Sequence, residues 1–248
     1  MSIDQSTEDN LELMRQPDWY DNAQKYWTAV SPTVNGMLGG FETIDPIDVK
    51  GSLSFVDEFV HGVRGVNNVV RKEPVMDSGY ACDCGAGIGR VTKNFLLKVP
   101  FQKVDLVEQA PNFVEQAKES YLANEIESGR VGNIFCMGLQ DFTPEKGKYD
   151  LIWCQWVLGH LTDDHLVAFF KRCIKGLKPN GMIAVKENNA SREAIIDEED
   201  SSVTRPNSSL KHLFNEAGLS VIKEEVQNGL PAGLFAVRMY MLKPNRQA

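Results

Sequence analysis

Residues 80–90 read Tyr-Ala-Cys-Asp-Cys-Gly-Ala-Gly-Ile-Gly-Arg, a short apolar run that ends in three alternating glycines. A helical pattern follows in residues 89–99, GRVTKNFLLKV. The glycines therefore form the turn between a strand and a helix. In a parallel sheet, such a turn lies at the carboxyl ends of the strands, where ligands bind. Glycine also lets the backbone approach a ligand closely, so this turn is the first candidate for a binding site.

The spacing of these glycines argues against two common nucleotide sites. A dinucleotide fingerprint needs G-x-G-x-x-G/A, but its last position is Arg90 when counted from Gly85 and Thr92 when counted from Gly87. The phosphate-binding pattern GxxxxGK[ST] is also absent. The remaining D-x-G-x-G-x-G pattern resembles the first motif of S-adenosylmethionine-dependent methyltransferases. That resemblance implies that Gly85 and Gly87 line the cofactor site. It also implies that Asp83 accepts from the cofactor's amine, directly or through water, and that Arg90 pairs with its carboxylate.

Strand and helix patterns alternate from Tyr80 onward. Strand patterns occupy residues 80–85, 103–108, 134–142, 149–157 and 182–188. Helical patterns occupy residues 89–99, 110–126 and 163–177. This alternation predicts a mainly parallel sheet with helices on both faces.

The chain ends with a different arrangement. An acidic stretch at 195–206 and a helical pattern at 208–219 precede two strand patterns, 221–227 and 234–242, with no helix between them. Such a link predicts an antiparallel pair. We therefore expect an α/β fold, the Rossmann-like seven-stranded sheet of class I methyltransferases, mostly parallel with an antiparallel edge strand.

The segment before the sheet predicts a helical cap. Trp19-Tyr20 and Tyr26-Trp27 are seven residues apart and so share one face of a helix. A glycine-rich turn follows at 36–41, then apolar residues at helical intervals in 52–63, and a loop at 64–79. We expect one domain at 19–248 with its cap at 19–63. Residues 1–18 match no assignable pattern and are expected to be disordered.

Composition and charge limit the partners. A net charge of −8 argues against nucleic acid, which is bound through Lys and Arg. No apolar run reaches the ~18–20 residues that span a bilayer, and the acidic start does not resemble a signal peptide. We therefore expect a cytoplasmic monomer with no membrane or nucleic-acid partner. Its 27.7 kDa mass leaves passive entry into the nucleus open.

The sequence favours a site without metal. Five cysteines form no CxxC pair, so buried thiols are expected rather than zinc ligands or disulfides. The acidic run 197–200 is the other candidate, as in metal-dependent O-methyltransferases. Its carboxylates are consecutive instead of distributed over strand ends, which argues against that use.

Two further positions suit a nucleoside ligand. Glu108 ends the second strand pattern, about 20 residues past the glycines, where an acidic side chain can hold both ribose hydroxyls. Leu139 and Gln140 belong to the run that closes the third strand, where an apolar contact and a polar group would grip adenine. Each could be an ordinary residue at a strand end. Their order along the chain favours the cofactor site.

Narrower motifs extend over residues 20–244. They comprise Tyr26-Trp27, Gly36-Met-Leu-Gly39-Gly40, the glycine turn, Gly138-Leu-Gln-Asp-Phe-Thr-Pro144, Ile152-Trp-Cys-Gln-Trp156, Gly159-His-Leu161 and Asp200-Ser-Ser202. Together they resemble the protein α-N-terminal methyltransferases. These enzymes methylate the terminal amine of proteins that begin, after Met removal, with Xaa-Pro-Lys or Xaa-Pro-Arg. The Asp/Asn-Pro-Pro-Tyr run typical of enzymes that methylate DNA amines is absent after the fourth strand.

The resemblance implies roles for individual residues. Trp27 would lid the cofactor, S-adenosylmethionine, and Gln155 would contact it. The catalytic residues would be Asp200, His160 and Asn188. The peptide would contact Leu38, Trp156, Asn188, Asp197, Asp200 and Ser202. The products would be S-adenosylhomocysteine and mono-, di- or trimethylated N-termini of ribosomal or chromatin-associated proteins.

The chemistry places a modest demand on a base. A free α-amine has a pKa near 7.7–8.0, so its deprotonation at pH 7 costs about 1 to 1.4 kcal/mol, against roughly 4.6 kcal/mol for lysine. Histidine suits such a task, and alignment should contribute more than proton removal.

Other readings stay open. His160 could cap a helix, the acidic run could be a solvated loop, and Trp156 could be a core residue. The whole chain could instead methylate a small molecule on nitrogen or oxygen, or recognise N-termini without chemistry. Two departures from the family pattern are Glu187, where many relatives have Asp, and Phe235, where some have Tyr.

Overall fold

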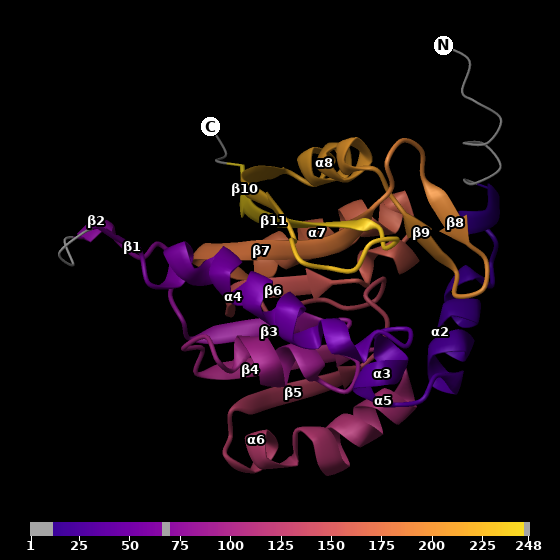
Figure 1. Cartoon of the computed structure of the whole chain (residues 1–248), viewed down its shortest axis with the longest axis horizontal. Coiled ribbons are helices and arrows are strands. Elements are labelled where there is room, and N and C mark those ends of the chain that lie inside the picture. The colour runs from indigo at the N-terminus through magenta and orange to yellow at the C-terminus, as the bar shows by residue number, and fades with distance from the viewer. Residues whose placement is uncertain (1–11, 66–69, 246–248) are drawn as a thin grey trace.

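The computed structural model describes residues 12–65 and 70–245. It contains a seven-stranded sheet in the order β10-β11-β7-β6-β3-β4-β5 (Figure 1). The strands are β3 Tyr80–Cys84, β4 Lys103–Glu108, β5 Val131–Cys136, β6 Tyr149–Gln155, β7 Leu177–Asn189, β10 Leu219–Val226 and β11 Ala236–Pro244. Strands β3 to β7 pair in parallel, whereas β11 is antiparallel to both β7 and β10. The predicted antiparallel pair at one edge is confirmed, and its reversed strand is β11, one place in from the edge.

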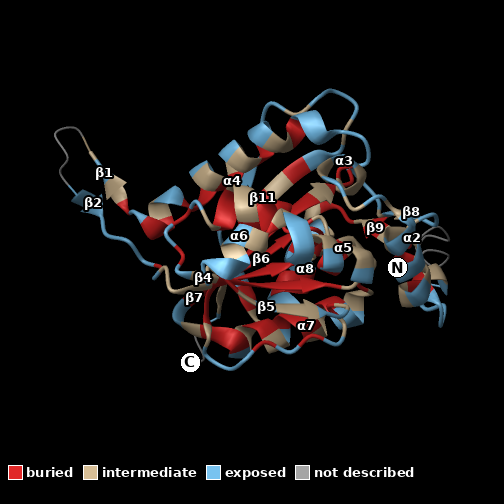
Figure 2. Cartoon of the chain, turned by 90° about the horizontal axis from the view of Figure 1, so that it is seen from below, coloured by how far each residue is buried: buried red, intermediate tan, exposed pale blue. Residues whose placement is uncertain are grey.

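Helices cover both faces of the sheet because successive strand side chains point to opposite sides. On one face lie α7 (Asp163–Gly176) and α8 (Asn207–Glu216). The core there includes Cys82, Ile152, Val185, Phe169, Phe170 and Phe214. On the other face lies α4 (Asp45–Val60), with a core that includes Leu151, Trp153, Phe55, Phe59 and Phe95. Figure 2 shows that buried residues are concentrated along the strands of the sheet.

Several predicted elements differ from the structure in their bounds. The pattern at 134–142 predicted a strand, but β5 ends at Cys136 and residues 137–142 form a loop. The side chain of Arg172, on α7, stabilises this loop, since it donates to the carbonyls of Leu139, Gln140 and Phe142 at 2.8–2.9 Å. The helix predicted at 110–126 is divided into α5 (Pro111–Gln116), a wide turn at Ala117–Tyr121 and α6 (Ala123–Glu127). The fully buried Leu122 lies at this break.

The N-terminal segment forms the predicted helices. The aromatic pairs lie on α2 (Trp19–Ala29), which is followed by α3 (Val34–Met37) and a short turn, Glu42–Ile44. Helix α4 begins at Asp45, seven residues before the predicted start, because Pro46 is well suited to the first turn. Residues 1–11 of the stretch expected to be disordered lie outside the described residues. Met14 packs with Trp19 and Val203.

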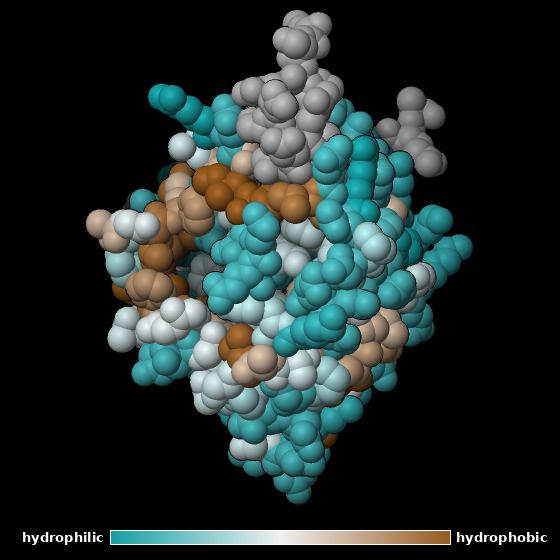
Figure 3. All heavy atoms as spheres, turned by 90° about the vertical axis from the view of Figure 1, so that its right-hand side faces the viewer, coloured by the Kyte–Doolittle hydropathy of each residue, from teal (hydrophilic) through white to brown (hydrophobic). Residues whose placement is uncertain are grey.

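Two short hairpins lie where the sequence predicted no strand. One pairs β1 (Val63–Arg64) with β2 (Val70–Lys72), and the other pairs β8 (Ile195–Asp197) with β9 (Ser202–Thr204). The second hairpin is formed by the acidic stretch and lies beside α2 (Figure 1). Figure 3 shows that side of the molecule as largely polar, with hydrophobic residues gathered along one edge. No helix within the described part of the chain is long and apolar enough to cross a bilayer.

Candidate active site

Two cavities lie at the carboxyl ends of the strands. The first, of about 860 Å³ with its mouth, is walled by the glycine turn after β3, the end of β4, the loop after β5 and the segment after β6. Helix α2 contributes Trp27 and helix α3 contributes Met37 to the wall of this cavity. Of the predicted cofactor residues, the following line it: Trp27, Gly85, Gly87, Arg90, Glu108, Leu139, Gln140 and Gln155.

The glycine turn has no room for side chains. Gly85 and Gly87 have φ values of +74° and +56°, which favour glycine. A Cβ on Gly85 would lie 2.5 Å from the Val157 side chain, and one on Gly87 would lie 2.1 Å from Met37 Sδ. Met37 Sδ also accepts from the Ile88 amide at 3.2 Å. The turn is therefore a cradle formed by backbone, as a close-fitting ligand requires.

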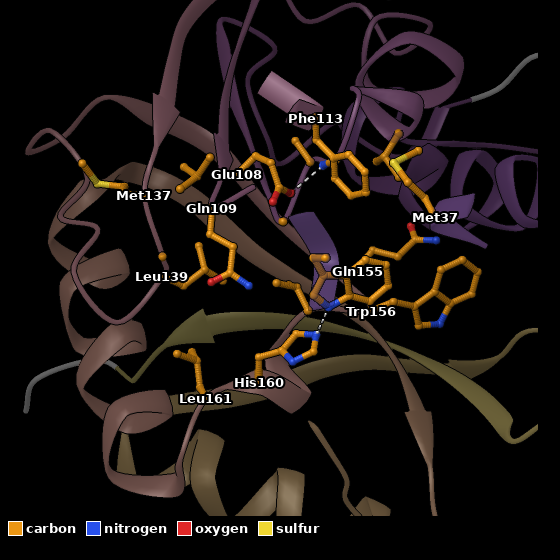
Figure 4. Close-up of a pocket in the computed structure, with 18 of the residues that line it drawn as sticks. Met37, Glu108, Gln109, Phe113, Met137, Leu139, Gln155, Trp156, His160 and Leu161 are labelled. Atoms are coloured by element: carbon orange, nitrogen blue, oxygen red, sulfur yellow. Dashed lines mark hydrogen bonds between the residues drawn. The ribbon is translucent and has the colours of Figure 1, made fainter. Parts of the chain in front are cut away.

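Two acidic residues flank the cradle at different depths. Glu108 lines the cavity and accepts from the Gly87 and Ala110 amides, both at 2.8 Å (Figure 4). Burial raises the pKa of Glu108. Asp83 lies beneath the turn, accepts from Thr92 Oγ1 at 2.7 Å and does not line either cavity. Burial raises the pKa of Asp83 to about 6. Its contact with the cofactor's amine therefore remains a prediction.

Arg90 and Gln155 are held by a residue that the sequence did not single out. Arg90 Nη1 donates to Asp45 Oδ1 at 2.6 Å and to Asp48 Oδ2 at 2.8 Å. Gln155 Nε2 donates to both carboxylate oxygens of Asp48 at 2.9 Å, while its Oε1 accepts from Trp153 Nε1. Asp48 is 1% exposed. Asp48 precedes the helical pattern that the sequence predicted at 52–63, so no local signal marked it.

The second cavity, of about 1030 Å³ with its mouth, adjoins the first. The two share the side chains of Trp27, Met37, Leu38, Trp156 and His160. Of the predicted peptide residues, it is lined by Leu38, Trp156, Asn188, Asp200 and Ser202. Asp197 does not line it; this residue is exposed, and its Oδ1 accepts from the Glu199 amide. Two ligands bound in these cavities would therefore meet at the shared wall.

Two polar atoms in the wall of the second cavity lack partners. Asp200 Oδ1 and Trp156 Nε1 are buried, and neither has a hydrogen bond to any described residue. Buried polar atoms of this kind are rare in folded proteins because each costs about 1–3 kcal/mol. One is an acceptor with negative charge and the other is a donor. This pair of one acceptor and one donor suits a ligand that carries an ammonium group beside a carbonyl oxygen.

The hydrogen bonds of His160 define its protonation at each ring nitrogen. Its Nε2 lies 3.0 Å from Trp27 Nε1 (Figure 4), and its Nδ1 lies 3.1 Å from the Ser201 carbonyl oxygen. An indole N–H only donates and a carbonyl only accepts. His160 therefore carries its proton on Nδ1, and its Nε2 lone pair accepts from Trp27.

The fold and the site define a class. The strand order, the glycine cradle after β3 and the buried acid at the end of β4 are those of class I methyltransferases that use S-adenosylmethionine. Within the described residues there is no group of three or more His, Cys, Asp or Glu placed to hold a metal ion. The cradle has room for such a cofactor, and Arg90 and Glu108 face the cavity in which it would lie.

Comparison with known proteins identifies the family. Residues 15–243 match the family described as AdoMet-dependent proline di-methyltransferase. The chain is 46% identical to alpha N-terminal protein methyltransferase 1 of Dictyostelium discoideum, over 91% of this chain and 79% of that protein. It is 46% identical to N-terminal Xaa-Pro-Lys N-methyltransferase 1 of Danio rerio, over 92% and 96%. A SAM-dependent methyltransferase structure from Leishmania major has a TM-score of 0.80 at 38% identity, covering 93% and 86%. The chain belongs to the AdoMet-dependent proline di-methyltransferase family.

Proposed function

We propose that this enzyme methylates the free α-amine of proteins that begin with Xaa-Pro-Lys or Xaa-Pro-Arg. The observation that carries the proposal is the unpaired, buried Oδ1 of Asp200 in a cavity that shares a wall with the cofactor cavity. A carboxylate in that position attracts a terminal ammonium group. The names of the relatives from Dictyostelium discoideum and Danio rerio agree with this substrate.

The walls of the second cavity suit proline as the next residue. Leu38 and Trp156 contribute apolar surface, and Phe235, which is 43% exposed, adds an aromatic ring. A proline ring is compact and its φ is fixed, so little conformational freedom is lost on binding. The unpaired Trp156 Nε1 can donate to a peptide carbonyl.

The β8–β9 turn supplies negative charge for a basic third residue. Asp197, Glu198 and Glu199 are exposed there. Burial raises the pKa of Tyr26 on α2, and the charges of Glu199, Asp200 and Asp197 raise it further. These carboxylates therefore approach α2 close to the cavity, where they would attract Lys or Arg.

The reaction needs alignment more than it needs a strong base. When bound, S-adenosylmethionine supplies an electrophilic methyl group on a sulfonium. Asp200 would orient the amine through its free Oδ1, whereas His160 Nε2 already accepts from Trp27. The proton of the amine would pass to solvent before the methyl group is transferred. Loss of the proton at pH 7 costs only about 1 to 1.4 kcal/mol. Asn188, which lines the same cavity, would hold the first residue. By family resemblance, we expect it to act on ribosomal or chromatin-associated proteins. The expectation of a cytoplasmic monomer rests on the sequence alone.

Labelled S-adenosylmethionine and three peptides test the proposal. The peptides begin Ser-Pro-Lys, Ser-Ala-Lys and acetyl-Ser-Pro-Lys, and mass spectrometry locates the added methyl groups. We expect label on the first peptide alone and its loss with Asp200→Asn. Glu193→Gln, a change at an exposed position outside that turn, is the control and should retain most activity. Label on none of the peptides would favour a small-molecule substrate or a binder without chemistry.

A further inference from the structure

A cluster of charged side chains lies directly behind the wall of the cofactor cavity. It joins Asp48 of α4, Arg90 after the glycine turn, Gln155 at the end of β6 and Lys186 on β7. Asp48 is 1% exposed and Lys186 is fully buried. Of these four, only Arg90 and Gln155 line the cavity. The proposed reaction makes no use of Asp48 or Lys186.

Asp48 is the centre of the cluster. Its Oδ2 accepts from Arg90 Nη1 at 2.8 Å, and both its oxygens accept from Gln155 Nε2 at 2.9 Å. Its Oδ1 lies 2.5 Å from Lys186 Nζ. Burial disfavours the charged form of Asp48, but Lys186 and Arg90 outweigh this effect and lower its pKa. Asp48 is therefore an ionised group with three partners, two of which reach the cofactor cavity.

Lys186 offsets the negative charge of Asp48, so that Asp48 does not repel the carboxylate of a bound cofactor. Arg90 alone would face two negative charges, from Asp45 and Asp48. A ligand that brought a further carboxylate would then be repelled. Lys186 adds a second positive charge. The charges of Asp45, Asp48, Arg90 and Lys186 therefore sum to zero. Its Nζ is also held by Asp48 O, Ser52 Oγ and Gln227 Oε1 at 2.9–3.0 Å.

We propose that Asp48 is a positioning residue for the cofactor, because it directs Arg90 and Gln155 toward the methionine part of S-adenosylmethionine. The inference rests on the predicted pairing of Arg90 with the cofactor's carboxylate. A free arginine side chain has many rotamers, and fixing one of them costs binding energy. Asp48 removes that cost before the cofactor arrives. The helical cap is thereby coupled to cofactor affinity.

A purely structural role is the competing explanation, and ligand choice separates the two. S-Adenosylhomocysteine carries the amino-acid carboxylate, whereas methylthioadenosine has the same nucleoside and lacks it. If Asp48 only holds α4 against the sheet, its loss would change the affinity for both ligands equally. A positioning residue affects only the ligand with the carboxylate.

The experiment measures the affinity of both ligands by calorimetry, without peptide. We expect Asp48→Asn to weaken S-adenosylhomocysteine roughly tenfold, the effect of a lost hydrogen bond to a charged group. Methylthioadenosine should change less than about twofold. In Asp48→Asn, Lys186 lacks the negative charge of Asp48 and tends toward its neutral form. The cluster therefore gains no net positive charge that would attract the carboxylate of S-adenosylhomocysteine. Asp57→Asn, an exposed change on the same helix, should alter neither affinity.

Each outcome bears on the proposal. Equal weakening of both ligands, no weakening, or tighter binding of S-adenosylhomocysteine by Asp48→Asn would overturn it. If Asp48→Asn does not fold, Asp45→Asn replaces it, since Asp45 is 19% exposed and bonds the same Arg90 nitrogen. This variant should again weaken only S-adenosylhomocysteine, and an equal effect on both ligands would refute the proposal.

Arg90→Met serves as the reference. If it leaves the preference for S-adenosylhomocysteine unchanged, the pairing of Arg90 with the carboxylate is wrong and the inference falls with it. The peptide assay stands apart from these measurements, so its failure would leave this result intact.

Discussion

At the scale of single residues, Glu187 shows how one buried carboxylate shapes the site. Its Oε1 accepts from the Val157 and Leu158 amides at 2.7 and 2.8 Å. The preceding residue, Trp156, has a φ of +52°, a conformation uncommon for a residue with a side chain. Glu187 thus holds the backbone turn that carries Trp156 into both cavities.

This carboxylate makes stability depend on pH. Burial raises the pKa of Glu187 to about 7 against its ordinary 4.5, although the Leu158 and Val157 amides lower it. The folded state therefore binds more protons than the unfolded state between these values, and stability falls as pH rises through the window. We expect the Glu187 contribution to the free energy of unfolding to fall by about 2 to 3 kcal/mol from pH 5 to pH 8.

Urea unfolding of the wild type and Glu187→Gln at pH 5 and pH 8 measures this contribution. The decrease should be smaller in Glu187→Gln by that amount, while Glu193→Gln, a change at an exposed position, should behave as the wild type. Burial raises the pKa of Asp83 too, so part of the decrease should remain in the variant. An equal decrease in the free energy of unfolding from pH 5 to pH 8 in the wild type and Glu187→Gln would contradict the prediction.

At the scale of elements, helix α2 is attached chiefly to the segment that follows β6. Trp19 Nε1 donates to the His160 carbonyl at 2.7 Å, and Tyr20 Oη lies 2.6 Å from His165 Nδ1. Trp27 Nε1 donates to His160 Nε2. Trp27 also lines both cavities, so the attachment of α2 and the enclosure of ligand depend on the same side chain.

Removal of one of these bonds should loosen α2 alone. In Trp27→Phe an aromatic ring remains but the N–H is lost, and a hydrogen bond contributes about 0.5–1.5 kcal/mol. We expect amide exchange in α2 to become roughly two- to tenfold faster, with α7 unchanged. Hydrogen–deuterium exchange followed by mass spectrometry gives both rates. Lys25→Gln, an exposed change on α2, is the control, and an equal increase in α7 would show a global effect instead.

At the scale of the whole molecule, the two ends of the sheet have different roles, ligand binding at one end and stability at the other. The carboxyl ends of the strands carry both cavities, whereas a buried cluster lies toward the opposite end. Its centre is the fully buried Asp105 on β4. This carboxylate accepts from Tyr149 Oη and the Asn133 amide at 2.7 Å and pairs with Lys148 at 2.8 Å. It links three strands by contacts that line neither of the two cavities.

Asp105→Asn should therefore separate stability from binding. Removal of one partner of a buried ion pair costs about 3 kcal/mol or more, so urea unfolding should show a loss of that size. The affinity for S-adenosylhomocysteine, measured by calorimetry, should stay within about twofold, since the end of β4 at Glu108 lies about 10 Å along the strand. A large loss of affinity in a variant that remains folded would show that the two ends are coupled.

The order of the elements and the place of the cofactor cradle were predictable because they follow from local pattern. Apolar periodicity locates strands and helices, and the spacing of Gly85 and Gly87 selects one class of turn. Eight of the nine predicted cofactor residues line one cavity, as expected when strand ends meet at one edge of a sheet. Family resemblance, not periodicity, supplied the peptide residues on the β8–β9 hairpin.

Contacts between residues far apart in sequence could not be predicted in this way. Arg172 on α7 holds the loop after β5 from about 30 residues away, and Lys186 meets Asp48 across 138 positions. Local pattern carries no information about such pairs, since each residue alone resembles an ordinary polar side chain. The three-dimensional arrangement brings them together in a low-dielectric interior, where a partner determines whether a charge can be buried at all. Local chemistry thus sets where the cofactor turn lies, and long-range packing sets how its walls are held.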